Sequence, residues 1–156
     1  MFSASSPFFA PRRSTVLAKN GMVASQEALA SDIGLQILKD GGNAVDAAVA
    51  VGFALAVTLP RAGNIGGGGF MMIYNAKQDK TIALDYREKA PSRATRDMYL
   101  DANGEAISDL SRYHGLAVGV PGTVAGLLKA LEDHGTMTRQ QVMAPAIALA
   151  ADGIDV

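Results

Sequence analysis

The chain lacks cysteine and tryptophan altogether, and it has only two histidines among its 156 residues. The absence of cysteine excludes disulfides, zinc–thiolate centres and thiol nucleophiles, but it does not identify the cellular compartment. Lys and Arg (14) nearly balance Asp and Glu (15), and no long run of either sign occurs. Nucleic acid is therefore not an expected partner, because phosphate binding needs clustered basic side chains.

Long apolar runs are missing as well. The longest, residues 47–59, is shorter than the roughly 20 residues that a membrane-spanning helix needs, so we predict a buried core helix and no membrane span. Residues 1–13 contain two prolines and lack the charged start of a signal peptide. They also lack the apolar stretch of about 7–15 residues that such a peptide carries. We therefore predict that residues 1–20 form a flexible arm.

The residues that are present indicate a globular chain, with 49% apolar and 19% charged residues. Apolar periodicity and turn residues predict the order helix, helix, strand, strand, irregular excursion, helix, helix. The predicted ranges are 25–39, 43–59, 70–74, 81–87, 91–116, 121–135 and 138–153.

Polar residues mark where the predicted helices begin. Ser25 is suited to cap the first helix, and Asn43 the second. Thr138 with Gln141 resembles a capping box before the last helix. Asp46 lies in the first turn of an otherwise apolar helix, where a capping role is favoured over a catalytic one.

The two predicted strands are expected to form a hairpin. The first, residues 70–74, is apolar on both faces, as is typical of a central strand. In the second, residues 81–87, Tyr86 shares the apolar face and Arg87 the polar face with Asp85. Two strands alone do not make a stable sheet, so strands from elsewhere are expected to complete this one.

A glycine-rich segment, residues 63–69, follows a predicted helix and precedes a strand. Dinucleotide-binding glycines stand in the reverse order, and no Walker lysine follows. Nucleotide binding is therefore disfavoured, and a tight backbone passage is predicted. The pattern leaves open whether this passage approaches a ligand or another part of the chain.

No catalytic or metal centre is complete in this chain. His114 and His134 have no partner at metal-ligand or triad spacing. No Gly-x-Ser-x-Gly motif occurs. Arg87 is the best candidate for binding, because a planar guanidinium can hold a carboxylate through two parallel hydrogen bonds. The residues alone leave equally open a structural pairing of Arg87 with Asp85 or Glu88.

Five segments together resemble the start of the large subunit of γ-glutamyltransferases, also called γ-glutamyl transpeptidases. The resemblance covers residues 21–156, and it is specific because all five segments occur in the family's order. They read GMVAS (21–25), GGNAVDAAVAVGFALAVTLP (41–60), GNIGGGGFM (63–71), DYREKAP (85–91) and PGTVAGLLKAL (121–131).

The resemblance implies an α+β fold, namely part of the αββα sandwich of an N-terminal nucleophile (Ntn) hydrolase with an incomplete sheet. It also implies a precursor that cuts itself into two subunits. The first threonine of the small subunit would attack the γ-glutamyl amide of glutathione. Water, an amino acid or a peptide would then accept the glutamyl group, and no cofactor or metal is implied.

The family's Asp-Phe-Arg-Glu-like motif reads Asp85-Tyr86-Arg87-Glu88 here. The resemblance therefore assigns to Arg87 the binding of the donor's α-carboxylate. Tyr86 departs from the usual phenylalanine, but it is expected on the opposite strand face and should not disturb Arg87.

No residue of this chain matches the catalytic threonine, which the resemblance therefore implies lies beyond Val156, the last residue of the sequence. Residues 21–156 are expected to be the N-terminal part of a large subunit and inactive alone. The expected partner is the small subunit or the remainder of the precursor. The family also implies a periplasmic or secreted location. A β-lactam acylase of the same family, and a non-catalytic remnant or binding subunit, stay open as alternatives.

Overall fold

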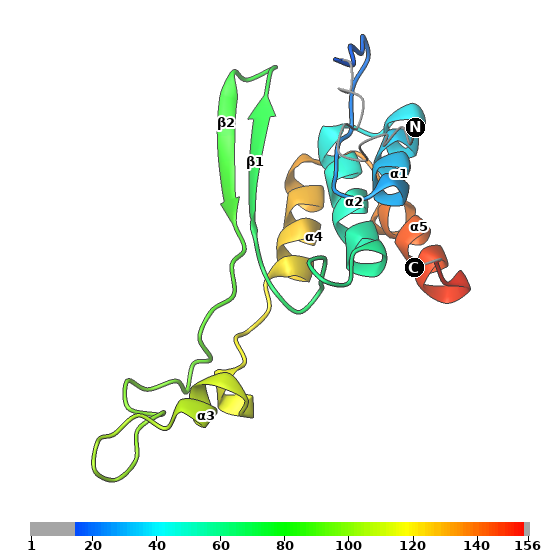
Figure 1. Cartoon of the computed structure of the whole chain (residues 1–156). Helices are drawn as coiled ribbons and strands as arrows, with labels where there is room; N and C mark the ends of the chain where they lie inside the picture. Colours follow the sequence, from blue (N-terminus) through cyan, green and yellow to red (C-terminus); the bar gives the residue numbers. More distant parts are fainter. Residues whose placement is uncertain (1–14, 155–156) are drawn as a thin grey trace, which may run out of the picture.

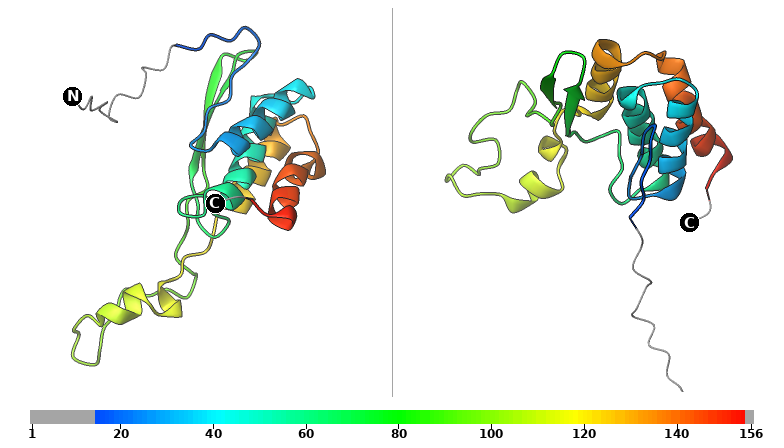
Figure 2. Two further views of the ribbon diagram at one scale, coloured as in Figure 1. Left: turned by 45° about the vertical axis from the view of Figure 1, so that its right-hand side comes forward. Right: turned by 90° about the horizontal axis from the view of Figure 1, so that it is seen from above.

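The computed structural model describes residues 15–154. Most of the arm predicted over residues 1–20 lies outside the described residues, and residues 15–20 are exposed and contain no helix or strand. Four longer helices form one layer, and a β-hairpin lies against that layer (Figures 1 and 2). No helix in the described part of the chain is long and apolar enough to cross a membrane.

Helix α1 (Ala28–Lys39) starts three residues later than predicted. Its cap is Glu27, whose carboxylate accepts the N–H groups of Leu29 and Ala30 at 3.0 and 2.9 Å. The prediction of Ser25 as the cap was wrong, because the Ser25 hydroxyl donates to the Glu27 carbonyl instead. The hydrogen bonds from the Leu29 and Ala30 amides hold the pKa of Glu27 below its usual range.

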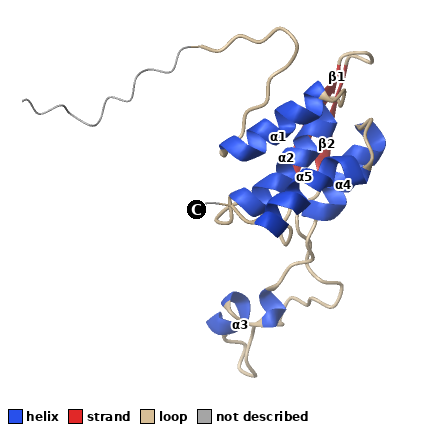
Figure 3. Ribbon diagram, turned by 90° about the vertical axis from the view of Figure 1, so that its right-hand side faces the viewer, coloured by secondary structure: helices blue, strands red, loops and turns tan. Residues whose placement is uncertain are grey.

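Helix α2 (Ala44–Thr58) lies at the centre of the helical layer. The predicted capping box is confirmed, since Asn43 and Asp46 each accept the other's backbone N–H. The prediction that α2 is buried all round needs one correction, because Ala44 and Ala48 are exposed. The rest of the helix packs against α1, α4 and α5 (Figure 3).

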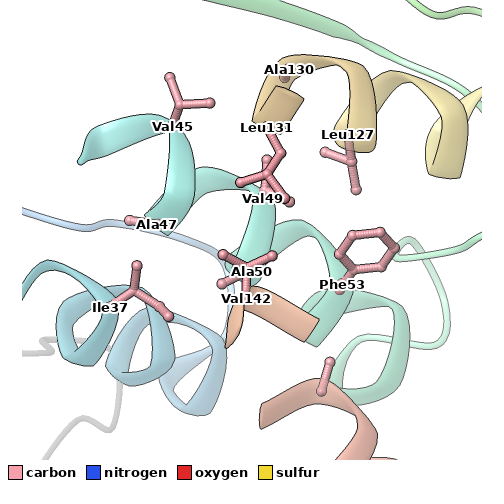
Figure 4. Packing of buried hydrophobic residues seen from close by; sticks show 11 residues of the cluster. Ile37, Val45, Ala47, Val49, Ala50, Phe53, Leu127, Ala130, Leu131 and Val142 are labelled. Atoms are coloured by element: carbon pink, nitrogen blue, oxygen red, sulfur yellow. The ribbon is translucent and has the colours of Figure 1, made fainter. Parts of the chain in front are cut away.

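The core is built mainly from α2 and the two C-terminal helices, α4 (Thr123–His134) and α5 (Arg139–Asp152). Val49 and Phe53 of α2 meet Leu127 of α4 and Val142 of α5 (Figure 4). Many of the other core residues are alanines, which let the helix backbones approach closely. The predicted capping box of Thr138 and Gln141 at α5 is confirmed.

Strands β1 (Phe70–Asn75) and β2 (Lys80–Asp85) form the predicted hairpin, with Phe70 opposite Asp85 and Asn75 opposite Lys80. Met71 and Ile73 of β1 and Leu84 of β2 pack against the helices, and the predicted alternation along β2 is confirmed.

The other face of β1 is open, although the sequence suggested a strand covered on both sides. Phe70, Met72 and Tyr74 on that face are 64–69% exposed. No third strand joins the hairpin within residues 15–154. The expectation of an incomplete sheet is therefore confirmed for the described chain.

The irregular excursion predicted over residues 91–116 is confirmed, and it extends away from the helical layer (Figure 1). It contains two short helices, α3 (Ser108–Arg112) and η1 (Gly115–Ala117). The chain leaves and returns at one place, where Lys89 pairs with Val120. Pro121 was predicted in the first turn of α4, but it precedes the Gly122 cap.

Candidate substrate-anchoring site

Arg87 lies just beyond β2, which ends two residues earlier than predicted. Just beyond the strand, the Asp85 carboxylate accepts the backbone N–H of Arg87 at 3.0 Å. The prediction that Arg87 belongs to the strand is therefore wrong, but its exposed, polar position is confirmed.

The guanidinium of Arg87 is open to solvent, with 71% of the side chain exposed. The nearest carboxylate in the described chain belongs to Glu88, and Nε of Arg87 lies 3.9 Å from its Oε2. An exposed pair at this separation contributes little to stability. Asp85 binds the backbone of Arg87 rather than its side chain, so the guanidinium keeps its capacity for a ligand.

The glycine-rich segment runs directly against the backbone of residues 86–88. A Cβ atom at Gly68 would lie 2.7 Å from the Tyr86 carbonyl oxygen and 2.8 Å from the Arg87 Cα. Real Cβ atoms do not approach backbone so closely, so only glycine fits here. The question left open by the sequence is thus answered: this tight passage approaches the chain at Arg87.

The start of helix α4 also lies against the backbone of residues 67 and 86. Gly122 and Thr123 donate their backbone N–H groups to the carbonyl of Gly67 at 2.7 and 3.0 Å. A Cβ at Gly122 would lie only 1.9 Å from the Tyr86 carbonyl oxygen. We call residues 67–69, Gly122 and Gly126 the glycine cradle, because together they enclose the backbone that carries Arg87.

Tyr86 fills the glycine cradle. A Cβ at Gly126 would lie 2.1 Å from Cγ of the tyrosine ring, and one at Gly69 would lie 2.9 Å from Cε2. The backbone N–H of Tyr86 donates to the Gly69 carbonyl at 3.0 Å. Burial raises the pKa of the Tyr86 phenol. The ring thus lies against α4 while the neighbouring Arg87 is exposed, as the sequence predicted.

The glycine cradle is a feature that the sequence interpretation missed. Gly126 gave the one available signal, because a glycine inside a helix costs about 1 kcal/mol relative to alanine and usually has a packing reason. Its partner Tyr86 lies on a different element, so the sequence did not reveal that reason.

Asp46 serves structure and not chemistry. Its side chain is fully buried and accepts hydrogen bonds from the Asn43 N–H, the Thr136 N–H and hydroxyl, and the Met137 N–H. Burial by itself would raise the pKa of Asp46, but the bonds from Thr136, Asn43 and Met137 outweigh it and lower the pKa. The favoured capping role is confirmed, and Asp46 also ties α2 to the α4–α5 connection.

The two histidines make no catalytic arrangement with Arg87. His114 accepts the Leu116 N–H and caps η1. The carbonyl of His134, at the end of α4, accepts a bond from the Asn43 side chain. Among the described residues, no three His, Cys, Asp or Glu side chains gather as a metal site would require.

The catalytic threonine was predicted to lie beyond Val156. Val156 is itself outside the described residues, which end at residue 154, so the structure does not test this placement and it stays a prediction.

Arg87 lies on open surface. A hollow of about 710 Å³ exists between β1 and the ends of α2 and α4, but Arg87 does not line it. The described residues therefore leave Arg87 exposed, and they do not form a pocket around it.

Comparison with known proteins identifies the family of the chain. The family model described as Gamma-glutamyltranspeptidase matches residues 30–156. The chain is 59% identical over 138 residues to the glutathione hydrolase proenzyme of Escherichia coli K12. This alignment covers 88% of the chain and 24% of the relative, so the chain spans about a quarter of the relative's length.

Solved structures show the same fold. The γ-glutamyltranspeptidase of Helicobacter pylori superimposes with a TM-score of 0.85 at 51% identity, covering 90% of this chain and 40% of that one. The cephalosporin acylase of Bacillus halodurans gives 0.82 at 33% identity, covering 100% and 28%. These likenesses confirm the expected fold class, part of an Ntn-hydrolase α+β unit. The chain belongs to the gamma-glutamyltranspeptidase family.

Proposed function

We propose that this chain supplies the donor-binding arginine of a γ-glutamyl transferase and glutathione hydrolase, as the N-terminal part of a longer precursor. The observation that carries the proposal is Arg87. Its side chain is 71% exposed on a turn that the glycine cradle holds in place, and the only ion-pair partner of its guanidinium in the described chain is Glu88, 3.9 Å away.

Arg87 would bind the α-carboxylate of the donor by two parallel hydrogen bonds. This contact fixes one end of the glutamyl group, so that its γ-carbonyl carbon meets a hydroxyl nucleophile at a defined distance. The nucleophile is a threonine beyond Val156. Its oxygen forms an ester with the γ-carbonyl carbon as the C–N bond breaks, and the amine leaves with a proton. Water or an amine acceptor then cleaves the ester.

The partners follow from this scheme. The chain would work with the small subunit and the remainder of its precursor, on glutathione or related γ-glutamyl compounds. Amino acids or peptides would compete with water as acceptors. We propose a periplasmic or secreted location, by the family resemblance alone.

A second candidate activity is removal of acyl side chains from β-lactams. The likeness to the Bacillus halodurans cephalosporin acylase over the whole chain favours it. The two activities differ at the donor, because a γ-glutamyl group carries an α-amino group and a glutaryl group, which keeps the terminal carboxylate for Arg87, does not. Comparison of γ-glutamyl and glutaryl anilides separates them.

The deciding experiment measures release of a chromogenic anilide from a γ-glutamyl donor. The intact, processed precursor is expected to turn over, and the 156-residue chain alone is not. Release by the chain alone above the buffer rate would contradict the assignment of the nucleophile to another segment. An authentic stop codon after residue 156, with no partner gene encoding a Thr-Thr-His-like start, would favour a non-catalytic remnant.

A further inference from the structure

The position of Arg87 is set by its neighbour Tyr86, which the glycine cradle holds at both ends of the ring. Gly126 lies against the near end, where an added Cβ would be 2.1 Å from Cγ and 2.3 Å from the tyrosine Cβ. Gly69 lies against the far end, 2.9 Å from Cε2 by the same measure. The ring therefore has no free direction in which to yield along its own length.

The backbone of Tyr86 is enclosed as well. Its N–H donates to Gly69, and its carbonyl oxygen lies against Gly68 and Gly122. The next N–H, that of Arg87, is held by Asp85. Consecutive Cα atoms are 3.80 Å apart across a trans peptide, so the Arg87 Cα is tied at a fixed distance to that of Tyr86.

The phenol hydroxyl contributes little to this arrangement. It lies 3.5 Å from the Phe70 carbonyl oxygen, at the limit of a hydrogen bond. The ring itself, rather than its hydroxyl, makes the close contacts with Gly69 and Gly126. A phenylalanine at position 86 keeps these contacts, while an alanine removes them.

We propose that Tyr86 and Gly126 form a positioning pair for Arg87: the ring, seated on the glycine of α4, sets where the guanidinium meets the α-carboxylate of the donor. This inference rests on the proposed function. Neither residue is assigned contact with the substrate. Their effect reaches the donor only through the position of Arg87.

The test uses the intact precursor and two donors, a γ-glutamyl anilide and its analogue with the α-carboxylate converted to an amide. Wild type is expected to prefer the carboxylate donor in kcat/KM. Gly126→Ala is expected to reduce this preference by about 10–100-fold, because an error near 1 Å in position has effects of that size. The loss should appear as a higher KM for the carboxylate donor. The kcat, calculated per correctly processed active site, should stay near the wild-type value.

The control is Gly66→Ala. An added Cβ at Gly66 has no neighbour within 4 Å, and its φ is not in the left-handed region. This substitution removes a glycine from the same segment and is expected to leave the donor preference unchanged.

Two further variants keep the test decisive. Tyr86→Ala should lose the preference for the carboxylate donor. Tyr86→Phe, which keeps the ring, should retain it. If Gly126→Ala does not fold, Gly69→Ala replaces it and should give a smaller loss of the same preference, because its contact is less severe.

Equal losses on both donors would show a merely structural role and overturn the positioning pair. Turnover by wild type with an unchanged preference in Gly126→Ala would overturn this inference and leave the proposed function standing. Absence of γ-glutamyl turnover in processed wild type would overturn both.

Discussion

The Thr136 hydroxyl donates to the carboxylate of Asp46 at 2.7 Å, joining residues 90 positions apart in the chain. The same carboxylate accepts the backbone N–H groups of Thr136 and Met137. Because the Asp46 side chain is fully buried, its carboxylate has no access to water as a substitute partner.

Replacing Asp46 by asparagine is expected to destabilise the α4–α5 connection. The amide offers one acceptor oxygen instead of two, and hydrogen bonds to charged groups contribute about 1.5–3 kcal/mol each. The precursor should lose at least about 2 kcal/mol. Hydrogen exchange should speed up in the segment around Thr136. Asp32→Asn, at an exposed position of α1, is the matched control. Unchanged exchange around Thr136 would refute this account of Asp46.

The pKa of Asp46 gives a dependence on pH. Its folded pKa lies below the value of an unfolded aspartate, so the stabilisation is present above about pH 4. It is lost as the pH falls through the folded pKa, because protonation removes a hydrogen-bond acceptor. The melting temperature of Asp46→Asn should therefore approach that of wild type in acid. A constant difference between pH 7 and pH 3 would contradict this.

Arg87→Ala should raise the donor KM strongly while leaving kcat at saturation near the wild-type value. Removing one partner of a desolvated charge pair costs about 2–5 kcal/mol, which is a factor of about 30 to several thousand. Arg87→Lys keeps the charge but loses the two parallel hydrogen bonds of a planar guanidinium. Its donor KM should lie between those of wild type and Arg87→Ala. Steady-state kinetics with a γ-glutamyl anilide provide the measurement.

The control for Arg87 is Arg96→Ala. Arg96 is 93% exposed, and its only ion pair in the described chain is with the adjacent Asp97. Its removal should leave donor KM unchanged. Wild-type donor kinetics in Arg87→Ala would show that the carboxylate anchor lies elsewhere.

The 156-residue chain alone is expected to self-associate through the open face of β1. Phe70, Met72 and Tyr74 place three large apolar side chains on one exposed strand, and such strands invite pairing with other chains. Replacing all three by threonine should increase the monomer fraction in size exclusion with light scattering.

Val16 and Leu17 provide the control for this face, since they are at least as exposed but belong to no strand. Their replacement by threonine should leave the association unchanged. If the wild-type chain is a monodisperse monomer with a cooperative thermal melt, the open face of β1 does not cause self-association.

Glu27→Ala should lower the melting temperature more than Ser25→Ala. Glu27 satisfies two N–H groups at the start of α1, whereas Ser25 bonds to Ser31 and the Glu27 carbonyl. Thermal melts of the precursor compare the two directly, and a larger loss for Ser25→Ala would reverse the assignment of the cap.

Local patterns predicted the parts of the fold that depend on neighbouring residues. The capping boxes at Asn43 and Thr138 and the two-residue alternation from Ile82 to Tyr86 were all confirmed. Each requires only residues within one or two turns of each other. Ser25 failed because residue preference favours serine over glutamate as a cap, whereas here Glu27 accepts the first N–H groups of α1 and the Ser25 hydroxyl donates to the Glu27 carbonyl.

The candidate site was predictable only in part. Arg87 was identified from its strand position and from the family motif, but the alternation of the strand did not reveal that β2 ends at Asp85. The contact of Gly67 with Gly122 joins segments that no periodicity relates. The glycine cradle therefore needed the three-dimensional structure, although each of its glycines was visible in the sequence.

The pairing of Lys89 with Val120 has a consequence for how this region can change in length. Lys89 and Val120 exchange backbone hydrogen bonds at 2.8 and 3.2 Å, so residues 90–119 begin and end at one point. The entropy of closing such a loop changes slowly with its length, by about 0.6 kcal/mol for each doubling. Insertions and deletions within residues 90–119 can therefore accumulate without shifting Tyr86 relative to α4.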